Sequence, residues 1–164
     1  MFDGALERRA AALIDAAAAR RLKIATAESC TGGLVAGLVT AIAGSSAVFE
    51  RGFIVYSNAA KSEVLGVPEH LIARFGAVSE ECARALCEGA IARSHADIAV
   101  SVTGIAGPGG GGAEKPVGLV HFACARRGAL TSAEVRRFGD VGRDAVRLAS
   151  VEVALGLLEK AVLR

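Results

Sequence analysis

A serine at the start of a predicted helix is the first residue that could do chemistry. Residues 24–27 predict a short strand, and the turn after it leads into a helix over roughly 32–42. Free N–H groups at a helix N-terminus bind anions or stabilise an oxyanion, and glycines let a ligand approach the main chain. The candidate nucleophile is therefore Ser29. The substrate-binding candidates in the same turn are Cys30, Thr31, Gly32 and Gly33.

Two other interpretations of this turn stay open. Ser29 or Thr31 could simply cap the helix, as most hydroxyl side chains at such positions do. Cys30 could be the nucleophile instead, although a reactive cysteine usually has an imidazole nearby and the sequence offers no obvious one.

A tyrosine and a lysine form the second candidate group. Tyr56, the only tyrosine, ends a predicted strand over 53–56, and Lys61 lies one helical turn beyond it. Such a pair can activate a serine when burial or another cation lowers the lysine pKa from about 10.4 to near 7. The alternative is a core tyrosine beside a solvated lysine. The spacing is one residue longer than the Tyr-x-x-x-Lys of short-chain dehydrogenases, and no matching N-terminal glycine motif precedes it.

A glycine-rich loop over 104–116 is the third candidate. Gly107, Gly109 and Gly112 formally satisfy G-x-G-x-x-G, but the dinucleotide fingerprint must open a helix and this segment leads into a strand. The loop is not a Walker A motif either. A glycine-rich loop inside a compact domain is more often functional than a plain connector, and phosphate or ribose binding is its natural use. The substrate-binding candidates here are Thr103, Gly104, Gly107, Gly109, Gly110 and Lys115.

Hydrophobic periodicity predicts the elements that must position these residues. We expect further helices over 4–21, 61–65 and 143–163, one starting at 79–81, and strands over 98–103, 117–125 and 132–138. This order predicts a single domain over 1–164, an α/β protein with a three-layer α/β/α sandwich and a mixed, mostly parallel sheet of about five strands. The final helix is apolar on two stripes, so it is either buried between layers or part of a dimer interface. We expect a homodimer.

Composition excludes several function classes. The net charge of +2 and the absence of a concentrated basic stripe with aromatics argue against nucleic acid as a ligand. No stretch of about 18 residues is uniformly apolar, and the N-terminus does not resemble a secretory signal, so we expect a cytoplasmic protein without a membrane partner. The four cysteines form no CxxC pair, and no histidine lies at metal-ligand spacing from them, so we expect neither a metal nor a cofactor.

Four segments together resemble the C-terminal domain of the competence/damage-inducible CinA family. They are AESCTGG (27–33), GSSAVFERGFIVYSNAAK (44–61), GAVSEE (76–81) and SVTGIAGPGGGGAEKPVG (101–118). They are colinear, and the resemblance extends over nearly the whole chain. Single-domain members of this family are nicotinamide-nucleotide amidohydrolases, so the resemblance implies hydrolysis of nicotinamide mononucleotide to nicotinate mononucleotide and ammonia.

The resemblance also assigns roles to three residues. The family's proposed catalytic serine, tyrosine and lysine fall on Ser29, Tyr56 and Lys61. Ser29 would attack the amide carbonyl, Lys61 would take its proton, and Tyr56 would orient or relay that proton. The family's Gly-Asp-Arg pattern is interrupted here, where two residues separate Asp140 from Arg143, so the resemblance leaves the role of Arg143 open. The alternative function is a nucleotide-binding or regulatory module without catalysis.

Overall fold

The computed structural model describes residues 2–164, which surround one five-stranded sheet. The strands are β1 (Ile24–Glu28), β2 (Phe49–Ile54), β3 (Ile98–Gly104), β4 (Leu119–Arg126) and β5 (Ser132–Arg137). Their order is β2-β1-β3-β4-β5; β1 pairs in parallel with both β2 and β3, whereas β4 is antiparallel to β3 and β5. Four strands therefore run in one direction and β4 runs against them.

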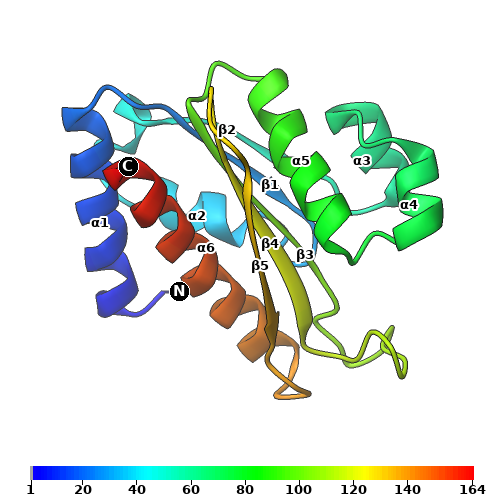
Figure 1. Ribbon diagram of the computed structural model, residues 1–164. Coiled ribbons are helices and arrows are strands. Elements are labelled where there is room, and N and C mark those ends of the chain that lie inside the picture. The colour runs from blue at the N-terminus through cyan, green and yellow to red at the C-terminus, as the bar shows by residue number, and fades with distance from the viewer. Residues whose placement is uncertain (1) are drawn as a thin grey trace.

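Helices cover both faces of this sheet. They are α1 (Gly4–Ala19), α2 (Leu34–Thr40), α3 (Asn58–Leu65), α4 (Glu69–Phe75), α5 (Glu80–Ala92) and α6 (Arg143–Leu163), with a short 3-10 turn η1 (Ser45–Ala47) before β2. Figure 1 shows α1, α2 and α6 on one face and α3, α4 and α5 on the other. The predicted α/β/α sandwich with a mixed sheet is confirmed.

Two elements differ from the sequence-based expectation. The second strand runs over Phe49–Ile54, not 53–56, because β2 lies at the sheet edge, where charged residues such as Glu50 and Arg51 are tolerated. Helix α4 was not predicted. It has seven residues, none of them fully buried, and no side chain caps its start, so it has little apolar periodicity to detect.

Two apolar clusters hold the layers together. One lies between the sheet and helices α1, α2 and α6, and the other lies between the sheet and the α3–α5 side. Helix α6 contributes both of its apolar stripes to the first cluster, including Val146, Val151, Leu155 and Leu157. Burial between layers therefore explains most of this two-sided pattern, and the homodimer stays a prediction that now depends on little more than the half-exposed Leu148.

The connections bring three loops to one edge of the sheet. From β1 the chain passes through α2 to β2, then returns through α3, α4 and α5 to β3 on the other side of β1. The carboxyl ends of β1, β2 and β3 therefore lie next to one another, at a point where the strand order reverses. Open α/β sheets bind ligands in the crevice at such a point.

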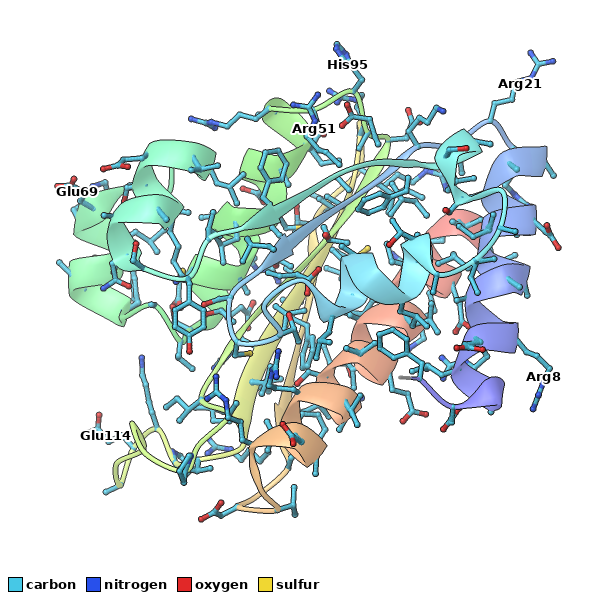
Figure 2. All side chains as sticks on the ribbon, turned by 180° about the vertical axis from the view of Figure 1, so that it is seen from behind. Arg8, Arg21, Arg51, Glu69, His95 and Glu114 are labelled. Carbon is cyan, nitrogen blue, oxygen red and sulfur yellow. The ribbon has the colours of Figure 1, made fainter. Side chains whose placement is uncertain are left out.

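The surface away from this edge is ordinary. Figure 2 shows Arg8, Arg21, Arg51, Glu69 and His95 projecting outward around the molecule, and Glu114 at the outer end of the glycine-rich loop. None of the helices within residues 2–164 combines the length and the apolar character needed to cross a lipid bilayer.

Candidate active site

Strand alternation separates the last residue of β1 from the residue that follows it. Successive side chains of a strand point to opposite faces of the sheet. Ile24 packs in the cluster under α1, α2 and α6, and Ala25 and Ala27 pack in the cluster on the α3–α5 side. By the same alternation Glu28 reaches α2 and Ser29 reaches α3, as their hydrogen bonds show.

Lys61 meets Ser29 on the α3 side of the sheet. Ser57 caps α3 by accepting a hydrogen bond from the Ala60 N–H, and this fixes the helix one turn before Lys61. The Lys61 Nζ donates to Ser29 Oγ over 3.2 Å and to the Tyr56 carbonyl oxygen over 2.9 Å. The structure thus brings together two of the three predicted catalytic side chains.

The environment of Lys61 favours a neutral amine. Its side chain is 1% exposed, and no carboxylate within residues 2–164 forms an ion pair with it. Burial therefore lowers the pKa of Lys61 below its ordinary value of 10.5, and this outweighs the opposing influence of the Cys82 and Cys30 thiols. A buried lysine whose pKa is lowered in this way can accept a proton from a neighbouring hydroxyl near neutral pH.

Burial shifts the pKa of the neighbouring thiol, Cys30, away from its reactive form. Cys30 is buried, and burial raises its pKa to about 11. A cysteine acts as a nucleophile in its thiolate form, and burial suppresses that form here. The local electrostatics therefore favour Ser29 over Cys30 as the nucleophile.

Tyr56 takes part in the site through its main chain. Its carbonyl oxygen accepts from Lys61, whereas its phenol is 61% exposed and its hydroxyl accepts a hydrogen bond from Arg143 Nη2 over 3.3 Å. The phenol makes no hydrogen bond to Ser29 or Lys61 in this structure, and its expected role in orienting or relaying the proton stays a prediction. The strand ends at Ile54, so Tyr56 lies in the loop at the rim of the pocket.

Arg143 is the one charged residue of the pocket lining that was not among the predicted site residues. It begins α6, and its Nη1 donates to the Gly107 carbonyl oxygen over 2.9 Å while Nη2 contacts the Tyr56 hydroxyl. No carboxylate within residues 2–164 pairs with it. The interrupted Gly-Asp-Arg pattern hid this position, but the start of a long helix next to that pattern was a usable signal.

These residues surround an open pocket of about 260 Å³. Of the predicted residues, the following line it: Ser29, Cys30, Tyr56, Lys61, Thr103, Gly104, Gly107, Gly109 and Gly110. The lining residues that were not predicted are Asn58, Ala77, Val78, Ile105, Ala106 and Arg143. The lining contains no aspartate or glutamate, and its two basic side chains are Lys61, whose burial favours the neutral amine, and the cationic Arg143.

Four predicted binding residues lie outside the pocket lining, namely Thr31, Gly32, Gly33 and Lys115. Lys115 Nζ donates to the Phe75 carbonyl oxygen over 2.5 Å, so it ties the glycine-rich loop to the end of α4. Gly32 and Gly33 have φ values of 59° and 95°, and a Cβ on Gly33 would lie 2.9 Å from Ile54 Cδ1. These glycines therefore serve the turn geometry.

The start of α2 is also occupied, contrary to the expectation that its N–H groups would face a ligand. The Glu28 carboxylate accepts hydrogen bonds from the N–H groups of Gly33, Val35 and Ala36 over 2.9–3.0 Å. A carboxylate of the protein itself thus fills the position where an anion would bind. A long side chain that folds forward over the next helix leaves no periodic signal in the sequence.

Residues 2–164 contain no group of three or more His, Cys, Asp or Glu side chains placed to hold a metal ion. The hydroxyl and amine groups of the pocket lining are those of Ser29, Tyr56, Lys61 and Thr103. Thr103 is already engaged, since its Oγ1 donates to the Ala77 carbonyl oxygen over 2.7 Å.

The sequence matches one family model and proteins whose names refer to that family or to an amidohydrolase. The family model described as the CinA C-terminal domain matches residues 6–162. A protein of Enterobacter agglomerans named nicotinamide-nucleotide amidohydrolase PncC is 52% identical over 133 residues, which are 80% of each chain. A putative competence-damage inducible protein of Caldicellulosiruptor bescii is 49% identical over 144 residues, covering 88% of this chain.

Several curated relatives are longer proteins. This chain spans about a third of their length, 34% in the Caldicellulosiruptor bescii protein. Among solved structures, the competence/damage inducible protein CihA from Agrobacterium tumefaciens has a TM-score of 0.97 and 50% identity, covering 100% of this chain and 99% of that one. The resemblance inferred from the four sequence segments is therefore confirmed.

Proposed function

The chain belongs to the CinA C-terminal domain family, and on that premise we propose that it hydrolyses the carboxamide of nicotinamide mononucleotide to nicotinate mononucleotide and ammonia. The observation that carries the proposal is the buried, unpaired Lys61 amine 3.2 Å from the Ser29 hydroxyl. Mere binding of a nucleotide needs neither a buried lysine nor its contact with a serine. The name of the Enterobacter agglomerans relative supports the choice of substrate.

The chemistry proceeds in two halves. Ser29 Oγ attacks the amide carbon while its proton passes to the neutral Lys61 amine, and the carbonyl oxygen becomes an oxyanion. Lys61 then gives that proton to the leaving nitrogen, the C–N bond breaks, and ammonia departs. Water attacks the resulting acyl-enzyme, with Lys61 again as the base, and releases nicotinate mononucleotide and free Ser29.

The N–H group of Cys30 is the candidate donor for the oxyanion. In serine hydrolases with a nucleophile on a strand-to-helix turn, the N–H of the following residue takes this role. Among residues 2–164 the Cys30 N–H has no acceptor on any other residue. Its one neighbouring acceptor is the thiol of Cys30 itself, so a substrate need displace no other residue to reach it, whereas the N–H groups of Gly32 and Gly33 are bonded to Ser29 and Glu28.

Charge orients the substrate within the pocket. The nucleotide carries a cationic pyridinium ring and an anionic phosphate, so the phosphate belongs beside Arg143 and the glycines near Gly107. The Tyr56 ring at the rim offers a face to the pyridinium, which is the usual partner of an aromatic face. The ring's positive charge also makes the carboxamide carbon more electrophilic.

Ammonia release from nicotinamide mononucleotide tests the proposal. We compare the wild type with Ser29→Ala, with a chelator present throughout, and use Ser94→Ala as the matched control because Ser94 lies at the end of α5, away from the pocket. Activity should persist in the control and vanish in Ser29→Ala. Loss in Cys30→Ala alone would support the cysteine alternative. A wild type that binds the nucleotide without releasing ammonia would favour the non-catalytic binding module.

A further inference from the structure

We propose that Glu28 and Arg147 are positioning residues, which hold the Ser29 turn from two sides so that the Cys30 N–H stays free for the oxyanion. The inference rests on the proposed amide hydrolysis. Neither side chain lines the pocket, so each acts through the main chain of residues 29–33.

Glu28 holds the turn from the side of α2. Its side chain is fully buried, and its two carboxylate oxygens accept three N–H groups of the helix start. Helices α1, α3 and α5 are capped by the residue directly before each helix, Asp3, Ser57 and Ser79. Helix α2 has Gly33 in that place and takes its cap from the strand instead. The Glu28 hydrogen bonds therefore connect the end of β1 to the start of α2 and enclose the turn that contains Ser29.

Arg147 holds the same turn from the side of α6. Its Nε donates to the Cys30 carbonyl oxygen over 3.2 Å, and its Nη2 donates to the Thr31 carbonyl oxygen over 3.0 Å. The planar guanidinium presents its donors in a fixed fork, which sets two consecutive peptide planes at once. An arginine that only neutralised Glu28 would point at its carboxylate, and no such ion pair occurs within residues 2–164.

Together these bonds fix every peptide plane between Ser29 and Gly33. The Ser29 carbonyl accepts from the Gly32 N–H over 3.0 Å, Arg147 holds the next two carbonyls, and Glu28 holds the Gly33 N–H. In a trans peptide the N–H points opposite to the carbonyl. Holding the Ser29 carbonyl inside the turn therefore directs the Cys30 N–H outward from the turn, next to the nucleophile.

Glu28→Gln and Arg147→Lys test the inference. A glutamine has one acceptor oxygen, so its NH₂ group would face an N–H of the helix start, and a lysine cannot reach both carbonyls in the fork geometry. We expect kcat to fall by about 10²-fold in each variant, the loss associated with a displacement of about 1 Å at a reacting centre, with KM little changed. The double variant should lose less than the product of the two single losses, because both act on one turn.

Asp97→Asn is the matched control. The Asp97 carboxylate also accepts a main-chain hydrogen bond, from the Lys23 N–H over 2.8 Å, but at the opposite end of β1. It should lower thermal stability and leave kcat intact. Folded Glu28→Gln and Arg147→Lys proteins that keep wild-type kcat would overturn the inference. If Glu28→Gln fails to fold, the half-buried Arg147→Lys variant decides alone.

A second readout separates this inference from the proposed substrate. The rate at which p-nitrophenyl acetate acetylates the protein is followed by mass, with Ser29→Ala as the blank. If nicotinamide mononucleotide is not hydrolysed but the acetylation rate falls in both variants, the substrate is wrong and the positioning role stands. Unchanged acetylation in both variants refutes the positioning role whatever the substrate.

Discussion

Replacing Lys61 by methionine tests the electrostatic basis of the site without reference to any substrate. Burial makes the folded protein release the Lys61 proton at lower pH than the unfolded chain, whose lysine has its ordinary pKa of 10.5. Between these two pKa values the unfolded state binds more protons than the folded state. The free energy of unfolding must therefore rise with pH in this window, by at most about 1.4 kcal/mol per pH unit for one proton.

Lys61→Met removes this contribution and keeps a side chain of similar length. The difference in unfolding free energy between wild type and variant should be flat below the folded pKa and climb in favour of the wild type above it, levelling near 10.5. Urea denaturation of both proteins at a series of neutral to alkaline pH values measures it. The buried cysteines titrate higher, with pKa values raised to about 11 for Cys30 and Cys82, and their contribution is largely shared by both proteins.

The pH dependence of kcat/KM should reflect the same ionisation of Lys61. If neutral Lys61 is the base, kcat/KM of the wild type rises about tenfold per pH unit up to the folded pKa and then levels, and Lys61→Met lowers it by about 10²–10⁴. The pH profile of kcat/KM and that of the difference in unfolding free energy should change slope at the same pH. Parallel stability profiles for wild type and Lys61→Met would show that the amine titrates normally in the folded state, and the argument for Lys61 as the base would be wrong.

Two further predictions concern recognition and packing. Arg143→Met should raise KM for nicotinamide mononucleotide by about tenfold or more, because hydrogen bonds to charged groups contribute about 1.5–3 kcal/mol. The same variant should leave KM for nicotinamide riboside, which has no phosphate, unchanged. Steady-state ammonia assays measure both KM values. Gly89→Ala should lower the unfolding free energy by about 1–3 kcal/mol in urea or thermal melts, because its Cβ would lie 2.2 Å from the Leu65 carbonyl oxygen. Its control, Gly156→Ala in α6, has its nearest neighbour, Arg9 Nη2, at 3.6 Å and should stabilise by about 0.5–1 kcal/mol.

Each of these has a result that contradicts it. An equal rise of KM for nucleotide and nucleoside would mean that Arg143 serves the pocket's shape and not phosphate recognition. A Gly89→Ala protein as stable as Gly156→Ala would show that α3 and α5 can separate without cost.

The sequence predicts best where burial is regular. Strand β3, buried almost throughout, and helix α5, with Ser79 as its cap, begin within a residue or so of their expected positions. Edge strand β2 begins earlier than the expected residue 53. It pairs with a neighbouring strand on one side only, so the charged residues Glu50 and Arg51 are tolerated in it and its hydrophobic pattern does not alternate. The short helix α4 was missed for a related reason, since it has no fully buried residue.

The candidate site likewise contains residues that local sequence patterns predict and contacts that they do not. Ser29 and Lys61 follow from motif and spacing because the carboxyl edge of parallel strands gathers their loops. Contacts made by long side chains do not follow. Glu28 caps a helix that begins beyond Ser29, Lys115 reaches back to α4, and Arg143 comes from a distant helix. Such contacts depend on three-dimensional proximity that a single sequence does not encode in any local pattern.

The place of α6 in the chain has a consequence for biosynthesis. Ser29, Lys61 and the glycine-rich loop all lie between residues 29 and 118, whereas Arg143 and Arg147 follow the last strand. A ribosome-bound chain that has emerged only as far as β5 thus holds Ser29 and Lys61 but neither arginine. If Arg147 holds the Ser29 turn as proposed, docking of α6 against β3 and β4 completes the site, and a nascent chain at the earlier stage would carry Ser29 in a less reactive state.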